Sequence, residues 1–261
     1  MRFRPCIDIH NGRVKQIVGG SLRDVNNQAK ENFVSEYDST YYAGKYKEDG
    51  LKGGHIIMLN APGSAYYEAT KKEALKALRA YPGGMQIGGG ITVENASEYL
   101  KAGASHVIVT SYAFGGGKIH WENIKRLCGA IGRERVVLDL SCRNKEDGCF
   151  YVVTDRWQKF TNVKLDTFVL ERLGEFCDEF LVHGVDAEGK SAGIMEDLVQ
   201  ILKAYEGRKT TYAGGIGSME HLKDFQKLSE GKLDFTIGSA LDLFGGSVSY
   251  EKILEYTRRR H

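Results

Sequence analysis

The chain of 261 residues has little proline and no strong excess of charge, and it lacks long apolar runs. Three prolines against 32 glycines exclude collagen, and a hydrophobic fraction of 42% is too high for a disordered linker protein. No apolar run approaches the roughly 18 residues that a membrane-spanning helix needs. A formal net charge of +2 gives no general electrostatic case for nucleic-acid binding. We therefore expect neither a membrane nor a nucleic acid as a partner.

The cysteines and histidines show no disulfide framework or metal-binding pattern. The five cysteines include no Cys-x-x-Cys pair, which favours a reducing compartment without structural zinc. The seven histidines include no His-x-x-x-His pair, so we expect no metal and no other cofactor. Residues 1–5 lack the apolar core of a secretion signal. The expected location is the cytoplasm, or a plastid if a transit peptide has been removed.

Short apolar stretches alternate with amphipathic stretches along the whole chain. The apolar stretches predict buried strands at residues 3–9, 55–59, 85–87, 106–109, 136–140, 180–182, 210–213 and 235–237. The amphipathic stretches predict helices at residues 34–48, 64–80, 93–102, 119–130, 165–177, 195–204, 218–228 and 250–258. Eight strand–helix units favour an α/β fold, a single (β/α)8 TIM barrel over residues 1–261, rather than an open doubly wound sheet.

The second half of the chain repeats features of the first half. Three pairs of residues recur in the same order, 131, 125 and 128 residues apart: Asp8 with Asp139, Gly90 with Gly215, and Ser111 with Ser239. A hairpin-like segment follows the strand of each aspartate, at residues 13–18 and 149–154. This echo predicts a half-barrel duplication, with halves at about 1–131 and 132–261.

Glycine and hydroxyl residues gather where the third, fourth, seventh and eighth predicted strands end. In a TIM barrel this face carries the active site, and glycine there lets a phosphate approach the backbone. Each set alone could be a tight strand-to-helix turn, but two symmetric sets predict a long substrate with a phosphate at each end. The first set begins just after Gly88. The predicted phosphate-binding residues are Gly89, Gly90, Thr110, Ser111, Gly214, Gly215, Gly238 and Ser239. No G-x-G-x-x-G motif stands in the context of a dinucleotide site.

Asp8 and Asp139 each stand near the end of an apolar strand, where a buried carboxylate needs a purpose or a partner. The first and fifth strands of an eight-stranded barrel lie across from each other. The two carboxylates therefore predict a general acid and a general base on opposite sides of one substrate. The alternative is that they bind loop amides or pair with Lys15 or Arg143. His183 ends the sixth predicted strand and is open as either a site or a scaffold residue.

Aromatic residues and polar loops carry further predictions. Helical spacing favours packing for four tyrosines: Tyr37, Tyr41, Tyr42 and Tyr46. Trp157 is either a core anchor or part of a substrate lid that brings Arg156 near a phosphate. The polar segment at residues 19–30 has a composition that permits closure over substrate.

Five segments carry a family resemblance that covers nearly the whole chain: RPCIDIHNGRVKQ (4–16), GGGI (88–91), VVLDLSCR (136–143), YAGGI (212–216) and TIGSALD (236–242). Through them the sequence resembles the phosphoribosylformimino-aminoimidazole carboxamide ribotide isomerase family of histidine biosynthesis. The third and fifth segments resemble the eukaryotic-type branch of that family.

The resemblance implies a half-duplicated (β/α)8 barrel and a small-molecule substrate with two phosphates. It implies an Amadori rearrangement, in which an acid protonates the ribose ring oxygen, the ring opens to a Schiff base, and a base removes the C2′ proton. It makes Asp8 the base, and we predict Asp139 as the acid. Many members carry Thr-Asp at the end of strand six, where this chain has His183-Gly184. His183 and Asp186 therefore stay open as alternative acids.

Two other functions remain open at this point. The related cyclase of the same pathway, imidazole glycerol phosphate synthase, shares the barrel, both aspartates and both phosphate sites. A non-catalytic barrel that binds a phosphorylated ligand is the second alternative. We expect a monomer, because the core of one barrel accounts for all of the apolar stretches and leaves none for an interface between subunits.

Overall fold

The computed structural model describes residues 1–17, 31–155, 157–188 and 193–258, which form an α/β fold around a curled sheet. The parallel strands are β1 (Cys6–His10), β4 (Gly54–Met58), β5 (Met85–Gly88), β6 (Val107–Val109), β9 (Val136–Asp139), β13 (Glu179–His183), β14 (Lys209–Ala213) and β15 (Asp234–Phe235). The antiparallel strands β2 (Arg13–Ile17) and β3 (Glu31–Val34) extend this sheet beyond β1. The strand order is β15-β14-β13-β9-β6-β5-β4-β1-β2-β3.

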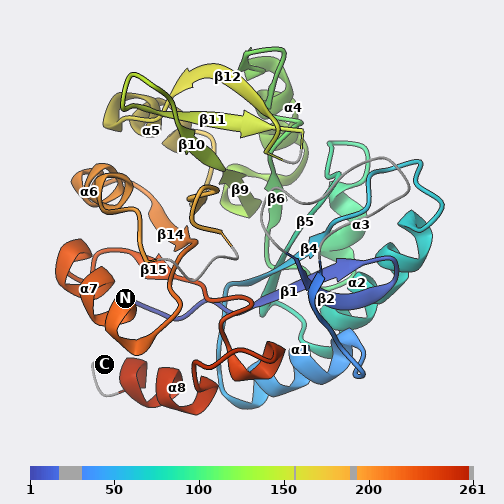
Figure 1. Cartoon of the computed structure of the whole chain (residues 1–261). Helices are drawn as coiled ribbons and strands as arrows, with labels where there is room; N and C mark the ends of the chain where they lie inside the picture. Colours follow the sequence, from blue (N-terminus) through green and yellow to red (C-terminus); the bar gives the residue numbers. More distant parts are fainter. Residues whose placement is uncertain (18–30, 156, 189–192, 259–261) are drawn as a thin grey trace.

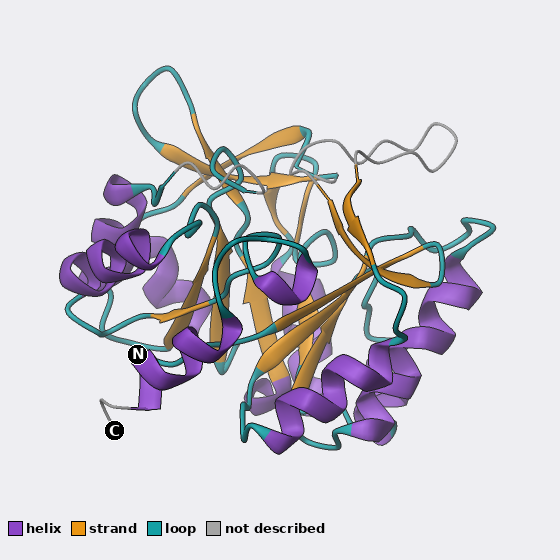
Figure 2. Cartoon of the chain, turned by 60° about the horizontal axis from the view of Figure 1, so that its bottom comes forward, coloured by secondary structure: helices purple, strands orange, loops and turns teal. Residues whose placement is uncertain are grey.

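The helices lie around the outside of the parallel strands (Figures 1 and 2). They are α1 (Ser39–Glu48), α2 (Tyr67–Ala80), α3 (Ala96–Lys101), α4 (Trp121–Ile131), α5 (Thr167–Gly174), α6 (Glu196–Ala204), α7 (Met219–Ser229) and α8 (Tyr250–Arg258), with short 3-10 turns at Arg133–Arg135 and Asp242–Phe244. Two small sheets complete the described chain: β7 (Phe114–Gly115) with β8 (Lys118–Ile119), and β10 (Cys142–Asn144) with β11 (Phe150–Thr154) and β12 (Lys159–Lys164). None of the described helices combines the length and apolar character needed to cross a membrane.

The alternation of strands and helices follows the prediction, but two predicted helices begin within strands. Ile119, predicted as the first residue of the fourth helix, lies in β8, and a larger error occurs at the first helix. Val34, predicted as helical, lies in β3 and pairs with Lys15 of β2. The helix begins only at Ser39, because the side chain of Asp38 caps it by accepting a hydrogen bond from the amide of Thr40. Pairing with the preceding hairpin thus outweighs the helical spacing of the residues that follow.

The two hairpin-like segments differ in how they join the structure. In the first half, β2 pairs directly with β1, with Ile9 opposite Val14. In the second half, β11 pairs with β10 and β12 in a separate sheet, which Figure 1 shows beyond the end of β9. The echo in the sequence therefore corresponds to strands in both halves but not to the same pairing.

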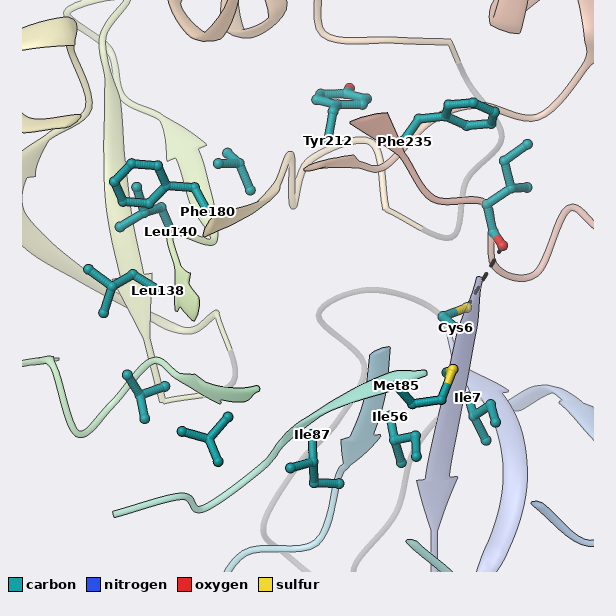
Figure 3. Packing of buried hydrophobic residues seen from close by; sticks show 14 of the residues in the cluster. Cys6, Ile7, Ile56, Met85, Ile87, Leu138, Leu140, Phe180, Tyr212 and Phe235 are labelled. Atoms are coloured by element: carbon teal, nitrogen blue, oxygen red, sulfur yellow. Dashed lines mark hydrogen bonds between the residues drawn. The ribbon is translucent and has the colours of Figure 1, made fainter. Parts of the chain in front are cut away.

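Side chains of the curled sheet pack on two sides, as the period of two along a strand requires. One side packs against the helices in the main core, which includes Leu138, Phe180 and Tyr212 (Figure 3). The neighbouring residues along the strands face inward and form a small separate cluster of Ile108, Val137, Leu181 and Ala213. This inner apolar layer lies within the curl of the sheet.

The chain just before β1 meets the far strand of the parallel set. Phe3 forms a parallel bridge with Phe235 of β15. The amide of Arg4 donates to the carbonyl of Phe235 at 2.8 Å, and the amide of Phe235 donates to the carbonyl of Arg2 at 3.0 Å. Backbone hydrogen bonds therefore connect the two ends of the row of parallel strands.

The prediction that four tyrosines pack into the core is correct for two of them. Tyr42 and Tyr46, one turn apart on α1, are fully buried. Tyr37 and Tyr41 are 59% and 44% exposed, and their rings stack on each other with centroids 4.3 Å apart. The prediction fails for Tyr41 because it lies on the outer face of α1, and for Tyr37 because it precedes the helix, which begins at Ser39. The predicted lid at residues 19–30 lies outside the described residues, as does Arg156.

Candidate active site

A cavity of about 400 Å³ opens where the parallel strands end. Its walls contain residues that follow β5, β6, β14 and β15, together with side chains from β1, β9 and β13. All of the predicted phosphate-binding residues line it: Gly89, Gly90, Thr110, Ser111, Gly214, Gly215, Gly238 and Ser239. Asp8, Asp139 and His183 line the same cavity. The structure thus brings the glycine sets and three candidate acid–base residues together in one place.

The glycine pairs after β5 and β14 have matching backbone geometry. Gly89 and Gly90 have φ angles of 102° and 71°, and Gly214 and Gly215 have φ angles of 115° and 76°. L-residues with side chains rarely adopt this left-handed region, so both turns depend on glycine. Both turns also pack tightly, because a Cβ atom on Gly89 would meet the backbone of Met58 and one on Gly214 would meet the backbone of Gly184. Phosphate binding itself stays a prediction for both pairs.

Both carboxylate oxygens of Asp139 have hydrogen-bond partners. Its Oδ1 lies 3.3 Å from Nδ1 of His183 and accepts a hydrogen bond of 2.8 Å from Ser141. Its Oδ2 accepts a hydrogen bond of 3.1 Å from the hydroxyl of Thr110. Thr110 therefore both lines the cavity and binds this carboxylate. Burial works to raise the pKa of Asp139, but His183, Ser141 and Thr110 together hold it below its ordinary value. Asp139 is therefore an ionised carboxylate at neutral pH.

His183 is the partner of that carboxylate and carries a proton. Burial works to lower the pKa of His183, but the charge and hydrogen bond of Asp139, with smaller effects from Glu188 and Asp8, raise it to about 9. With Nδ1 directed at Asp139, the remaining ring nitrogen, Nε2, is the one that could deliver a proton elsewhere. The sixth strand therefore contributes a positive charge to the cavity.

Asp8 has a different environment from Asp139. It accepts a hydrogen bond from the side-chain amide of Gln16, whose Nε2 lies 3.2 Å from Oδ2. Burial and the nearby charge of Glu188 raise the pKa of Asp8 to about 7, while His183 and the Gln16 hydrogen bond work in the opposite direction. A carboxyl group with a pKa near neutrality can both accept and release a proton under ordinary conditions.

Glu188 is a further carboxyl group in the cavity wall. Its Oε2 atom is buried and has no hydrogen-bond partner within the described residues. Burial raises the pKa of Glu188 above its ordinary value, and the charge of His183 partly offsets this effect. Asp186, the alternative acid predicted two residues earlier, does not line the cavity. It instead accepts hydrogen bonds from Nε of Arg143 at 2.8 Å and from the amide of Asn144 at 3.2 Å.

Two aromatic rings lie beside His183. The ring centroid of Trp157 is 6.0 Å away, and that of His55 is 6.2 Å away. Trp157 is half-buried and lines the cavity, so it does not serve as a core anchor; its role in a mobile lid stays a prediction. Burial and the charge of His183 lower the pKa of His55 to about 3, which leaves it neutral.

Sequence reasoning missed Gln16 and Glu188. Gln16 has no local signal, because its strand also contains Arg13 and Lys15, and only its 3% exposure in the structure shows that it points inward. Glu188 lies in the same acidic run as Asp186, and nothing local distinguishes the two. Among the described residues, no group of three or more His, Cys, Asp or Glu side chains is arranged to hold a metal ion.

The sequence matches a known protein family and several named relatives. The model of a family described as "Histidine biosynthesis protein" matches residues 2–248. The chain belongs to this family. It is 50% identical over 260 residues to a protein of Medicago truncatula named 1-(5-phosphoribosyl)-5-((5-phosphoribosylamino)methylideneamino) imidazole-4-carboxamide isomerase, chloroplastic, covering 98% of this chain and 81% of that protein. Isomerases of the same name from Neurospora crassa and Saccharomyces cerevisiae are 44% and 41% identical, each over 99% of both chains. The resemblance to the isomerase family is confirmed.

Proposed function

We propose that this chain catalyses the Amadori rearrangement of a phosphoribosylformimino-aminoimidazole carboxamide ribonucleotide, from an aminoaldose to an aminoketose. The observation that carries the proposal is the cavity in which Asp8 and the Asp139–His183 pair lie together with two matched glycine sets. The relatives are named as isomerases of this substrate, which favours the isomerase over the cyclase and over a non-catalytic binding protein.

We propose that the parallel strands close into one complete barrel formed by a half-barrel duplication. The Phe3–Phe235 bridge supports closure, because it joins the two ends of the row of parallel strands. The left-handed glycine pairs after β5 and β14 support the duplication, because each stands at the same place in its half. In such a barrel β1 and β9 lie across from each other, which places Asp8 opposite Asp139.

Asp8 is proposed as the base that removes the C2′ proton. Its pKa of about 7 is suited to a base, since much of it is ionised at neutral pH and its conjugate acid can return the proton. The proton moves from C2′ to Asp8 as the Schiff base becomes an enolamine. A proton then adds at C1′ to give the ketose. C2′ is oxidised while C1′ is reduced, so the reaction consumes no redox cofactor.

His183, with Asp139 as its partner, is proposed as the acid that protonates the ribose ring oxygen. Asp139 was the predicted acid, but its pKa is held low, so it is a poor proton donor by itself. The imidazolium of His183 carries the proton, and Asp139 orients it and stabilises its charge. Protonation of the ring oxygen breaks its bond to C1′ and opens the sugar.

The two glycine and hydroxyl sets are proposed to bind the two phosphates, one at each end of the substrate. This length fits a cavity that crosses the strand ends from Gly89 and Ser111 to Gly215 and Ser239. The expected partner is this small molecule alone, bound by a monomer in the cytoplasm, with a plastid as the alternative location.

The test is turnover of the purified aminoaldose substrate by the purified protein. We expect formation of the aminoketose without any added cofactor, and no cyclised product when ammonia is supplied. Binding of the substrate without conversion would overturn the proposal in favour of a binding protein, and cyclisation would overturn it in favour of the cyclase.

A further inference from the structure

Gln16 connects the Asp8 carboxylate to the end of the last parallel strand. The residue is buried in β2, and its Nε2 atom lies 3.2 Å from Oδ2 of Asp8 and 3.8 Å from Sγ of Cys6. The Sγ atom of Cys6 in turn lies 3.8 Å from the carbonyl oxygen of Ile237 (Figure 3). The amide end of Gln16 therefore lies between β1 and the segment that follows β15.

The other atom of the same amide, Oε1, lies close to the place where a side chain on Gly238 would begin. A Cβ atom placed on Gly238 would lie 2.6 Å from Oε1 of Gln16, closer than real Cβ atoms come to their neighbours. Gly238 is not among the residues with positive φ, so its backbone conformation does not require glycine. The requirement is space, and the space is occupied by Gln16. This differs from Gly89 and Gly214, whose left-handed backbones themselves call for glycine.

We propose that Gln16 is a positioning residue that holds the Asp8 carboxylate for proton abstraction, and that position 238 is glycine to make room for it. By occupying Oδ2, the amide leaves Oδ1 as the oxygen that can take the proton. A side chain at position 238 would displace the amide, and a hydrogen bond of 3.2 Å has little length to spare. The inference rests on the proposed role of Asp8 as the base.

The surroundings of Asp8 predict the direction of the effect. The titratable groups that face Asp8 are Cys6 on β1, Tyr46 on α1, His183 on β13 and Glu188 in the turn after β13. The Gln16 amide is the neutral donor among these neighbours, and its hydrogen bond lowers the pKa of Asp8. Loss of that donor removes a stabilising contact of the ionised form, so the pKa of the base rises.

The first test compares Gln16→Met, which keeps the volume but loses the donor, with wild type over a range of pH. The low-pH limb of the kcat/KM profile should move to higher pH. The variant should lose about threefold to tenfold in kcat/KM at pH 6 and less at pH 9. A uniform loss at every pH would indicate a purely structural role and would overturn the proposal.

The second test is a double-mutant cycle with Gln16→Ala and Gly238→Ala. Gly238→Ala should move the low-pH limb in the same direction as Gln16→Met. In the Gln16→Ala background there is no amide to displace, so the same alanine should no longer move the low-pH limb, and any loss from crowding the phosphate site should be the same at every pH. Independent, multiplicative effects would overturn the link between the two residues. Gly129→Ala, at an exposed helical position with open space around it, is the matched control and should leave activity unchanged.

A readout that does not depend on turnover separates this inference from the proposed function. The carboxyl carbon of Asp8 can be titrated by NMR in protein with labelled aspartate, and the resonance missing in Asp8→Asn assigns it. The midpoint should be higher in Gln16→Met and in Gly238→Ala than in wild type. Unchanged midpoints would overturn the inference. Shifted midpoints with an unchanged pH–rate profile would uphold the link between Gln16, Gly238 and Asp8, and would contradict the role of Asp8 as the base.

Discussion

Buried charged side chains occur at both ends of the parallel strands. The acids at the amino ends have charged or hydrogen-bonding partners, whereas some of the described acids at the carboxyl ends lack a cation. At the amino ends, Nε of Arg4 donates to Asp234 at 2.8 Å, and Nη2 of Arg4 donates to Glu179 at 3.3 Å. Gln86 donates to the second oxygen of Glu179 at 2.7 Å. Each acid at this end therefore has a donor, although Arg4 is only 3% exposed.

At the carboxyl ends, the buried acids among the described residues have unequal numbers of hydrogen-bond and ion-pair partners. Asp139 has His183 as its partner, whereas Asp8 has a neutral amide and Glu188 has a buried oxygen with no partner within the described residues. Uncompensated buried charges destabilise a protein, and they gather where chemistry needs shifted pKa values. The comparison indicates that the amino-end charges serve the fold and that the carboxyl-end charges serve a reaction.

The largest expected effect is on turnover, from the Asp139–His183 pair. His183→Gln removes the acid that opens the ribose ring, and Asp139→Asn removes the charge that keeps this acid protonated, so each should lower kcat about 10²- to 10⁴-fold. Both should remain folded by circular dichroism. Activity near the wild-type level in His183→Gln, together with a large loss in Glu188→Gln, would contradict the assignment and transfer the proton donor to Glu188.

The amino-end cluster should respond in stability rather than in turnover. Arg4→Met leaves Glu179 and Asp234 buried without their cation, and should lower the free energy of unfolding by about 3–5 kcal/mol in urea titrations. The folded fraction should keep its kcat within about threefold. Arg2→Met is the matched control, since Arg2 also pairs with Asp234 but is 43% exposed, and should cost about 0–1 kcal/mol. Equal losses in the two variants would contradict the distinction.

A negative charge at either predicted phosphate site should weaken substrate binding. Ser111→Asp and Ser239→Asp should each raise KM about tenfold or more, with a smaller change in kcat, because the added carboxylate repels a phosphate. Ser97→Asp, on an exposed position of α3 outside the cavity, is the control and should leave KM unchanged. If KM stayed at the wild-type value in both site variants, the two-phosphate site would be wrong.

The smallest expected effect is the pH dependence of the wild type. The value of kcat/KM should rise as Asp8 ionises near pH 7, and should fall as His183 loses its proton near pH 9. The folded-state pKa of His183 is raised from 6.5, so the stability from its pairing is fully present below about pH 6.5 and is lost as pH rises through about 9. A pH–rate profile in His183→Gln that still falls near pH 9 would assign that limb to another group.

The sequence predicts the repeating elements and the location of the site, but not the choice between neighbouring acids. Apolar strands and glycine turns are local patterns, and every predicted phosphate-binding residue lines the cavity. Asp186 and Glu188 share one turn, and its orientation depends on distant contacts, namely the Arg143–Asp186 ion pair and the bridge from Cys142 to Gly184. Such long-range contacts leave no local signal in the sequence.

The pairing of Gln16 with Asp8 is hidden for a related reason. The hairpin of β1 and β2 is evident from alternation, but a single glutamine in it has no motif. The reason for glycine at position 238 is equally invisible, since it depends on a side chain more than 200 residues earlier in the chain.

The most direct test of the contrast between the two ends is Asp8→Asn, measured at pH 8 for both turnover and unfolding. The pKa of Asp8 is raised from 3.8 to about 7, so ionising it at pH 8 costs the native state free energy that a neutral amide does not. The account predicts that turnover falls by about 10²- to 10⁴-fold, while the free energy of unfolding is equal to or greater than that of wild type. Retained turnover, or a loss of stability as large as that of Arg4→Met, would contradict it.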